Sequence, residues 1–392
     1  HQWQHIAQVV ELGFTLLDSK QAFFDHLCLG FKNKAAIFSW QGFFEVPSSY
    51  ITLRNFEIDG QGAMVNGIRS SGNFAHHIIL EDLFIHNLGR HQQIVGISSK
   101  CPAWDWRVRR NVITGAGTGM YFGNSDGNHP FWSGIIENNL VANTIGYNLQ
   151  IKHQNPRPKP PGMPLEPRAT IIRHNVFTKA AGGSVGPDAR PNVLVGHWPL
   201  QGAGKDDIYL IYGNAFHENP NESLFQGEGR IALYSNLFYS SRGNEFPAVA
   251  IQPHNDIPRK VRVFFNTVLH PWKGIRILRK EGATELDQQI VGNAVFSETP
   301  IQGGQQAENL VADYPDAQDY LQSPIGPLGS LSLFPKPGKL ERGRITLKQF
   351  SEFPDFDRDF NGLKRDSRFR GAYSGAGRNP GWNLAVERML LK

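Results

Sequence analysis

Residues 108–113 read VRRNVI, and this arrangement of a short strand-like run around an Asn returns through most of the chain. The Asn is followed each time by apolar-x-apolar or a close variant. The segments are LRNFEI, VRRNVI, IENNLV, IRHNVF, IYGNAF, LYSNLF, VFFNTV and IVGNAV, with asparagines at Asn55, Asn111, Asn139, Asn175, Asn214, Asn236, Asn266 and Asn293. LEDLFI fits the same frame with Asp82 in the Asn position. Repeats at such spacing, 22 to 39 residues, indicate a solenoid.

Each repeat also contains a second short strand with Gly or Asn at the bends. These stretches are VNGIRSS, IVGISSK, GMYFGNSD, NLQIKHQ, VLVGHW, SLFQGEG, AVAIQPHND and GIRILRK. Long segments with helical periodicity are absent from the sequence, so the repeat predicts an all-β parallel solenoid. An Asn suits a repeated bend because it tolerates left-handed backbone angles, and its amide can hydrogen-bond the Asn of the next coil.

This pattern over residues 50–305 resembles the right-handed parallel β-helix proteins of the pectate-lyase-like superfamily. The right-handed twist is what that resemblance implies. We expect residues 1–49 to form an N-terminal cap, with a helix that begins at Asp18 or Ser19. Residues 306–392 lose the repeat and resemble the closing segments of bacterial β-helix proteins, which implies an irregular cover packed along the solenoid.

Composition is that of a folded, turn-rich protein: 392 residues, 40% hydrophobic, 19% charged, 41 Gly and 26 Phe. The chain starts with His, from which we expect a processed protein that is secreted or periplasmic. A net charge of +5 favours an acidic partner, but it is weak for nucleic acid, and the chain carries no recognisable nucleic-acid module or membrane span. Cys28 and Cys101 are predicted to be buried thiols.

No metal or cofactor is predicted. Asp355, Asp357 and Asp359 have the spacing of a calcium loop, but Phe360 stands where the loop needs Gly, and Asp366 stands where it needs Glu. We interpret this stretch as a solvated turn.

Stacking the second strands predicts a functional site, because equivalent residues of neighbouring coils lie about 4.8 Å apart. Aligned within about one residue, one column contains Lys100, Asn124, Lys152, His197, Glu228 and His254. Beside it run Asp126, His153, Gln226, Gln252, Asn255 and Asp256. Taken singly, each is more often a surface or turn residue. Four ionisable side chains within three coil steps nevertheless indicate a site.

A stiff proline-rich loop, PRPKPPGMPLEPR, leaves the solenoid beside this column and carries Arg157, Lys159 and Arg168. It either forms one wall of a groove or merely connects two strands. As a wall it would make the groove basic, and an acidic polysaccharide is the linear polymer that such a groove suits. We expect substrate contacts from Asn124, His153, Arg157, Lys159, Gln226, Asn255 and Asp256.

β-Elimination at a uronic acid needs a base for the C5 proton, a neutralised carboxylate and an acid for the leaving oxygen. Lys152 is the candidate base, since nearby cations lower the pKa of a lysine. His197 and His254 are the candidate acids, and Glu228 completes the catalytic set.

Lys152 in NLQIKHQN resembles the lysine base of the alginate-lyase and chondroitinase-B family of β-helix lyases. That family has an Arg-His-Gly motif one coil later, whereas this chain has Gly196 followed by His197. Ile145 and Tyr147 stand where the family has acidic calcium ligands. The resemblance therefore implies a lyase that works without this calcium site.

Two other functions remain open from the sequence. A glycoside hydrolase needs two carboxylates about 5 Å or about 6.5–9.5 Å apart, and Glu228 with Asp256 on adjacent coils fits either spacing. A non-catalytic polysaccharide-binding β-helix needs neither a base nor an acid. Fold alone does not separate the three functions.

Overall fold

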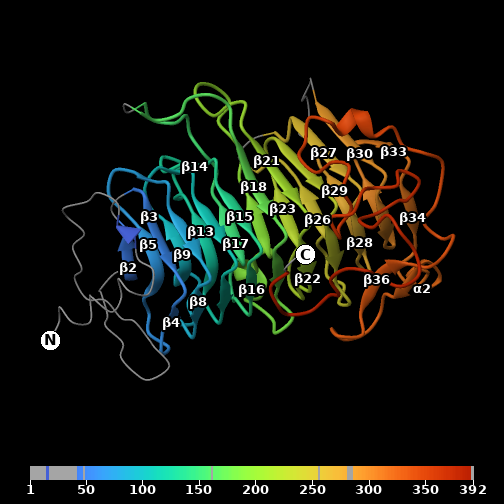
Figure 1. Ribbon diagram of the computed structural model, residues 1–392, viewed down its shortest axis with the longest axis horizontal. Coiled ribbons are helices and arrows are strands. Elements are labelled where there is room, and N and C mark those ends of the chain that lie inside the picture. Colours follow the sequence, from blue (N-terminus) through green and yellow to red (C-terminus); the bar gives the residue numbers. More distant parts are fainter. Residues whose placement is uncertain are drawn as a thin grey trace.

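The chain folds as a parallel β-helix, as the repeat predicted, and its right-handed coil is the one that the resemblance implied. The computed structural model describes residues 15–16, 42–46, 49–159, 162–254, 257–279 and 286–389. In this part of the chain three long sheets run side by side along one elongated body (Figure 1). The predicted N-terminal helix, Cys28, Asn255 and Asp256 lie outside the described residues.

Each coil contributes one strand to each sheet, so neighbours in a sheet are one coil apart in sequence. Sheet A is formed by β1 (Thr15–Leu16), β3 (Ile51–Arg54), β7 (Ile79–Glu81), β11 (Arg107–Arg109), β15 (Ile135–Glu137), β18 (Ala169–Arg173), β21 (Ile208–Tyr212), β24 (Ile231–Tyr234), β27 (Lys260–Phe264), β30 (Asp287–Val291) and β33 (Gln305–Ala307). Its strands are parallel except β1, which pairs antiparallel with β3.

Sheet B is formed by β4 (Glu57–Asp59), β8 (Phe84–His86), β12 (Val112–Thr114), β16 (Leu140–Ala142), β19 (Val176–Thr178), β22 (Ala215–His217), β25 (Leu237–Tyr239), β28 (Thr267–Leu269), β31 (Ala294–Phe296) and β34 (Leu310–Ala312). Sheet C is formed by β2 (Gly42–Val46), β5 (Asn66–Ser70), β9 (Val95–Ser99), β13 (Thr118–Phe122), β17 (Leu149–Ile151), β20 (Val193–Val195), β23 (Phe225–Gly227), β26 (Val249–Ile251), β29 (Lys273–Ile277) and β32 (Thr299–Gln302). A short fourth sheet contains β6 (Ala75–His76), β10 (Ala103–Trp104) and β14 (Phe131–Trp132).

The repeated asparagines form a buried ladder at the bend between sheets A and B. From Asn111 to Asn293, each Nδ2 donates to the Oδ1 of the next ladder residue at 2.9–3.0 Å, and the last acceptor is Asn309. Each Oδ1 also accepts the backbone N–H of the Asn below it. The ladder thus satisfies buried polar groups that a tight bend would otherwise leave without partners.

The left-handed backbone angles belong to the residue before each ladder Asn, which corrects the expectation that the Asn itself adopts them. Arg110, Asn138 and His174 have φ of 55° to 56°. Asn55 and Asp82 occupy this preceding position, with φ of 61° and 52°. They are therefore one residue out of the ladder, which begins at Asn111 with the N–H of Leu83 donating to its Oδ1.

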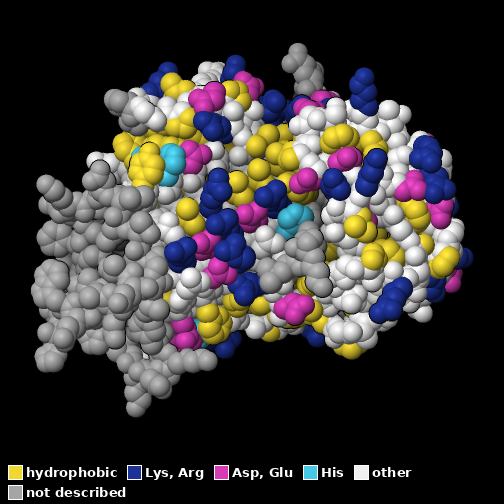
Figure 2. All heavy atoms as spheres, in the orientation of Figure 1, with side chains coloured by type: hydrophobic (Ala, Val, Ile, Leu, Met, Phe, Trp, Pro, Cys, Tyr) yellow, Lys and Arg dark blue, Asp and Glu magenta, His cyan; other side chains and the backbone are white. Residues whose placement is uncertain are grey.

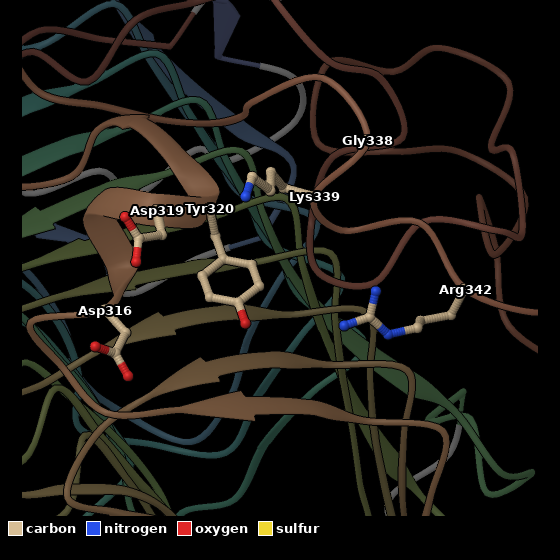
Figure 3. Close-up of a pocket in the computed structure, with 6 residues that line it drawn as sticks. All are labelled: Asp316, Asp319, Tyr320, Gly338, Lys339 and Arg342. Atoms are coloured by element: carbon tan, nitrogen blue, oxygen red, sulfur yellow. The ribbon is translucent and has the colours of Figure 1, made fainter.

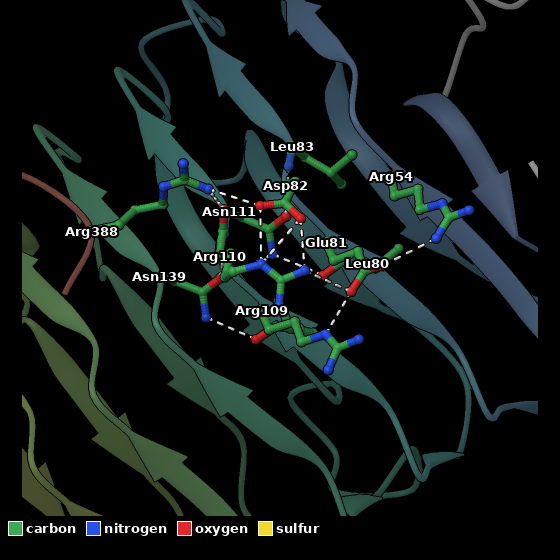
Figure 4. Close-up of polar contacts among 11 residues, drawn as sticks. Arg54, Leu80, Glu81, Asp82, Leu83, Arg109, Arg110, Asn111, Asn139 and Arg388 are labelled. Carbon is green, nitrogen blue, oxygen red and sulfur yellow. Dashed lines mark hydrogen bonds and ion pairs between the residues drawn. The ribbon is translucent and has the colours of Figure 1, made fainter. Parts of the chain in front are cut away.

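One position on the outer face of sheet A carries a ladder of alternating charge. Its members are Arg54, Glu81, Arg109, Glu137 and Arg173, paired in register. Glu81 accepts from Arg109 at 2.6 Å, and Asp82 accepts from Arg110 and from Arg388 of the C-terminal segment (Figure 4). Acidic and basic side chains are likewise interleaved on the face shown in Figure 2.

The long sheets continue past the expected boundary at residue 305 to β34, and residues 313–389, called the cover below, are mostly irregular. They contain the four-residue helix α2 (Ala317–Tyr320) and the hairpin β35 (Leu321–Ser323) with β36 (Ser332–Pro335). The segment turns back along the solenoid, so that Met389 O accepts a hydrogen bond from Asn138 Nδ2 at the bend between β15 and β16 (Figure 1). Within the described residues, no helix has the length and apolar character needed to span a membrane.

Candidate functional site

The predicted site residues lie where the strands of sheet C end. Along these strands, Met120, Leu149 and Val193 point into the core. Tyr121 and Gln150 stand between such positions and therefore face outward, because side chains alternate along a strand. The position just after each strand is also an outward one. Charged side chains gather in that position and beside it.

Register fixes the first outward column as Lys100, Gly123, Lys152, Gly196, Glu228 and Gln252. The parallel hydrogen bonds continue into it, since Lys152 N donates to Phe122 O and Glu228 N donates to Val195 O. Gly196 contributes no side chain between Lys152 and Glu228. These two residues stand two strands apart, about 10 Å between their backbones, which two long side chains can span.

His197 lies one position further on and faces His153, not Lys152. The two imidazole rings stack with centroids 5.4 Å apart. His197 Nδ1 is 2.9 Å from Trp198 O, and because a carbonyl only accepts, Nδ1 carries a proton. Nε2 is then the nitrogen left to exchange a proton with a ligand. The sequence alignment was therefore one residue in error here: Gly196, not His197, occupies the column of Lys152, and His197 occupies the neighbouring column.

Burial and neighbouring cations lower the pKa of the two column lysines. Burial lowers the pKa of Lys152 most, and the charge of Arg190 lowers it further against the opposing effect of Glu228. Burial lowers the pKa of Lys100 to about 8, with further contributions from Arg69 and Lys152. The Lys100 ammonium also lies 3.5 Å from the centre of the Tyr121 ring. The site therefore combines positive charge with amines that lose a proton more easily than ordinary lysines.

Three residues of this face were not predicted from the sequence as part of the site. Arg190 comes from the loop before β20 and acts on both Lys152 and Tyr147. Tyr121 and Tyr147 are half-buried phenols on the same face, and burial raises the pKa of each. The outward position of Tyr121 in the GMYFG strand was a usable signal. Arg190 lies in an irregular loop, and no periodicity places such a residue.

Arg157, predicted to bind substrate, is instead a buried anchor of the proline-rich loop. Its guanidinium donates to both carboxylate oxygens of Asp207 at 2.6 Å and stacks over Trp132 at 4.9 Å. Only 4% of Arg157 is exposed. Burial raises the pKa of Asp207 to about 6 despite this pairing. Lys159, two residues later, is exposed.

The other predicted residues lie on or beside this end of sheet C. Asn124 organises the turn after β13, where its Oδ1 accepts the N–H of His129 at 3.1 Å. Gln226 faces outward and donates to Glu222 at 2.7 Å. Glu228 is 5% exposed and accepts the backbone N–H of His254, whose side chain is exposed.

Two cavities in the described part of the chain lie against the cover. One, of about 420 Å³, is bordered by Asp316 and Asp319 on one side and by Lys339 and Arg342 on the other, with the Tyr320 ring between them (Figure 3). A second, of about 470 Å³, lies near the bends after β22 and β25. An open face of a sheet suits a long polymer better than a small molecule.

Comparisons with known proteins assign this chain neither a family nor a function. The A-module of the mannuronan C-5 epimerase AlgE6 from Azotobacter vinelandii is similar in structure, with a TM-score of 0.31 and 14% sequence identity. The alignment covers 70% of this chain and 76% of that module. No protein family and no curated protein matches the sequence. At this TM-score the likeness carries no argument about function.

Proposed function

We propose that the chain cleaves an acidic polysaccharide by β-elimination on the outer face of sheet C. The proposal rests on the environment of Lys152. This half-buried lysine has a lowered pKa, and the cations Lys100 and Arg190 and the stacked rings of His153 and His197 are its neighbours. An uncharged amine is a base, and neighbouring cations attract an anionic substrate.

The reaction assigns one role to each group. Lys152 Nζ takes the C5 proton, and the released electron pair forms the C4–C5 double bond as the C4–O4 bond breaks. The leaving oxygen takes a proton from Nε2 of His197 in its protonated form. Lys100 and Arg190 offset the charge that develops on the uronate carboxylate. Because such polymers lie outside the cell, we also propose a secreted or periplasmic location.

The hydrolase alternative has weaker support in the described residues. Glu228 is 5% exposed and accepts a backbone N–H, an environment that suits a carboxylate holding the end of β26 in place. Its proposed partner, Asp256, lies outside the described residues. Glu228→Gln therefore serves as the discriminating variant.

The test is a product assay on a panel of uronic-acid polysaccharides. Elimination yields unsaturated products that absorb ultraviolet light. Lys152→Ala is expected to lower the rate by about 10²–10⁴-fold, because a general base contributes about that much. Lys364→Ala is the matched control, since this exposed lysine of the C-terminal segment lies outside the proposed site, and it should keep nearly full activity.

Three results would contradict the proposal. Saturated reducing ends that vanish in Glu228→Gln but persist in Lys152→Ala would establish a hydrolase. Binding of the polymers without any product would establish a non-catalytic binding protein. Retention of full activity by Lys152→Ala would by itself remove Lys152 from the mechanism.

A further inference from the structure

The cavity of about 470 Å³ lies where two bends of the solenoid meet residues 325–328 of the cover. One wall is polar and comes from the solenoid: His217, Glu218, Ser241 and Arg242. The opposite wall is apolar and comes mainly from the cover: Ile325, Pro327 and Leu328. A pyranose ring has the same division, with C–H groups on its faces and hydroxyl groups around its rim.

Glu218 is the most informative residue of the polar wall. It is 8% exposed and adopts a left-handed φ of 49°, at a bend where Asn87, Gly115 and Asn143 follow other strands of sheet B. A left-handed, desolvated glutamate is unfavourable compared with Asn or Gly at the same bend. Such an outlier points to a function for the side chain.

The Glu218 carboxylate is held in place but retains acceptor capacity. Oε1 accepts Ser241 N at 3.0 Å and Ser241 Oγ at 2.6 Å, while Oε2 accepts Ser240 Oγ at 3.2 Å. A carboxylate has about four acceptor positions, so these bonds leave one for a further donor. A ligand hydroxyl supplies that donor, whereas a ligand carboxylate would be repelled.

The neighbours of Glu218 also favour an uncharged ligand. His217 is buried, its Nδ1 lies 2.9 Å from Thr178 Oγ1, and its ring stacks on Tyr239 at 5.6 Å. Burial lowers the pKa of His217, so the imidazole is uncharged near neutral pH. The cation Arg242 is exposed at the rim rather than deep in the cavity.

An exposed aromatic ring stands just beyond this rim. Trp272 is 54% exposed, and its ring packs directly against Gly243, the residue after Arg242. A side chain at Gly243 would overlap the indole, because an added Cβ would lie 1.8 Å from Trp272 Cδ1. Exposed tryptophan rings are platforms on which the C–H face of a sugar stacks.

We propose that this cavity is a carbohydrate-binding site for a neutral pyranose, with Glu218 accepting a sugar hydroxyl and the Ile325 wall packing on the ring. The site does not depend on the reaction proposed for sheet C. It would let the protein hold a neutral residue or branch of a polysaccharide away from the bond that is cleaved.

The experiment is a titration of the full chain with the methyl pyranosides of glucose, galactose, mannose and glucuronic acid, followed by saturation-transfer NMR. At least one neutral pyranoside is expected to bind with a Kd in the millimolar range. Glu218→Gln should weaken it by about tenfold, as expected for loss of a hydrogen bond to a charged acceptor. Ile325→Asp should do the same without touching the Glu218 network, since Ile325 is 43% exposed.

Val311→Asp is the matched control, because Val311 is an apolar residue of similar exposure on β34, outside the cavity lining. It should leave the affinity unchanged. The proposal is overturned if none of the neutral pyranosides binds, if only the glucuronide binds, or if binding survives both Glu218→Gln and Ile325→Asp. None of these outcomes bears on the Lys152 assay.

Discussion

Lys179 is a buried lysine whose amine contacts the loop that carries Arg190. Its side chain is fully buried after β19, and Nζ donates to Arg190 O at 2.7 Å. Burial lowers its pKa to about 7, with Glu222 opposing the shift and Arg190 adding to it. The contact holds the loop from which Arg190 reaches sheet C. A structural lysine thus supports a residue of the candidate site.

Lys179 should make the stability of the fold depend on pH. Its folded pKa lies near 7 and its unfolded pKa near 10.5, so between these values the unfolded chain binds the extra proton. Stability therefore rises with pH across this window, by about 1.4 kcal/mol per unit from this residue. Below about pH 7 the buried charge is fully present and destabilises the fold.

Lys179→Met removes this group while keeping most of its volume. Denaturant unfolding of both proteins from pH 7 to pH 9 is the measurement. The wild-type free energy of unfolding should climb more steeply than that of Lys179→Met. Parallel curves would mean that Lys179 stays charged in the folded protein and that its pKa is not lowered.

At the level of strands and bends, the sequence predicted the solenoid because one coil is one repeat. The repeated asparagines from Asn111 to Asn293 predicted the buried bend, and the apolar positions of the second strands predicted sheet C. Outward columns were harder to predict. After β20 the regular alternation of inward and outward side chains ends. The sequence therefore does not fix whether Gly196 or His197 is in register with Lys152.

Pairings between distant loops left no periodic signal at all. Arg157 in a proline-rich loop looked like an exposed cation, and its buried partner Asp207 is 50 residues away. Arg190 is likewise a loop residue, and hydrogen bonds from Lys179 and Asn219 to its backbone oxygen hold it where its charge acts on Lys152. Residues on repeats were thus predictable to within one position, whereas residues on loops were not.

Removal of one Asn from the ladder is expected to lower the free energy of unfolding by about 2–4 kcal/mol. Asn236 Oδ1 accepts both N and Nδ2 of Asn214, and its own Nδ2 donates to Asn266 Oδ1 and to Ile211 O. Asn236→Ala leaves these buried groups without partners, which should cost about 2–4 kcal/mol. Thermal or denaturant unfolding measures the loss.

Asn128→Ala is the control for this variant, because Asn128 lies in an exposed turn and its change should stay within about 0.5 kcal/mol. Equal effects of the two substitutions would mean that the ladder contributes no more than a surface hydrogen bond. The solenoid would then depend on its apolar core alone.

Across the whole molecule, the cover packs on the solenoid through two apolar clusters, one on sheet B and one on sheet A. The column that begins with the Arg–Glu ladder continues as Tyr212, Tyr234 and Phe264. Their rings stack at 4.8 and 4.6 Å, and Phe350 of the cover stacks on Phe264 at 4.1 Å. In the charged half of the column, exposure ranges from the buried Glu81 to the exposed Arg54, whereas the aromatic half is where the cover packs.

Phe350→Ala should therefore detach the cover locally. Phe350 is 1% exposed, and truncation of a buried Phe costs about 3–5 kcal/mol. The backbone bonds from Gly371 to Gly292 O and from Ala372 to Thr267 Oγ1 tie the same segment to the solenoid, so they report its opening. Hydrogen exchange should accelerate at residues 345–374 and stay slow in β13 and β17, which lie several coils away.

Leu363→Ala, at a residue of the cover that is 51% exposed, should change neither region. Equal acceleration in the cover and in β13 would show instead that the two unfold as one cooperative unit, and the cover would then be part of the solenoid's own stability rather than a separable layer on it.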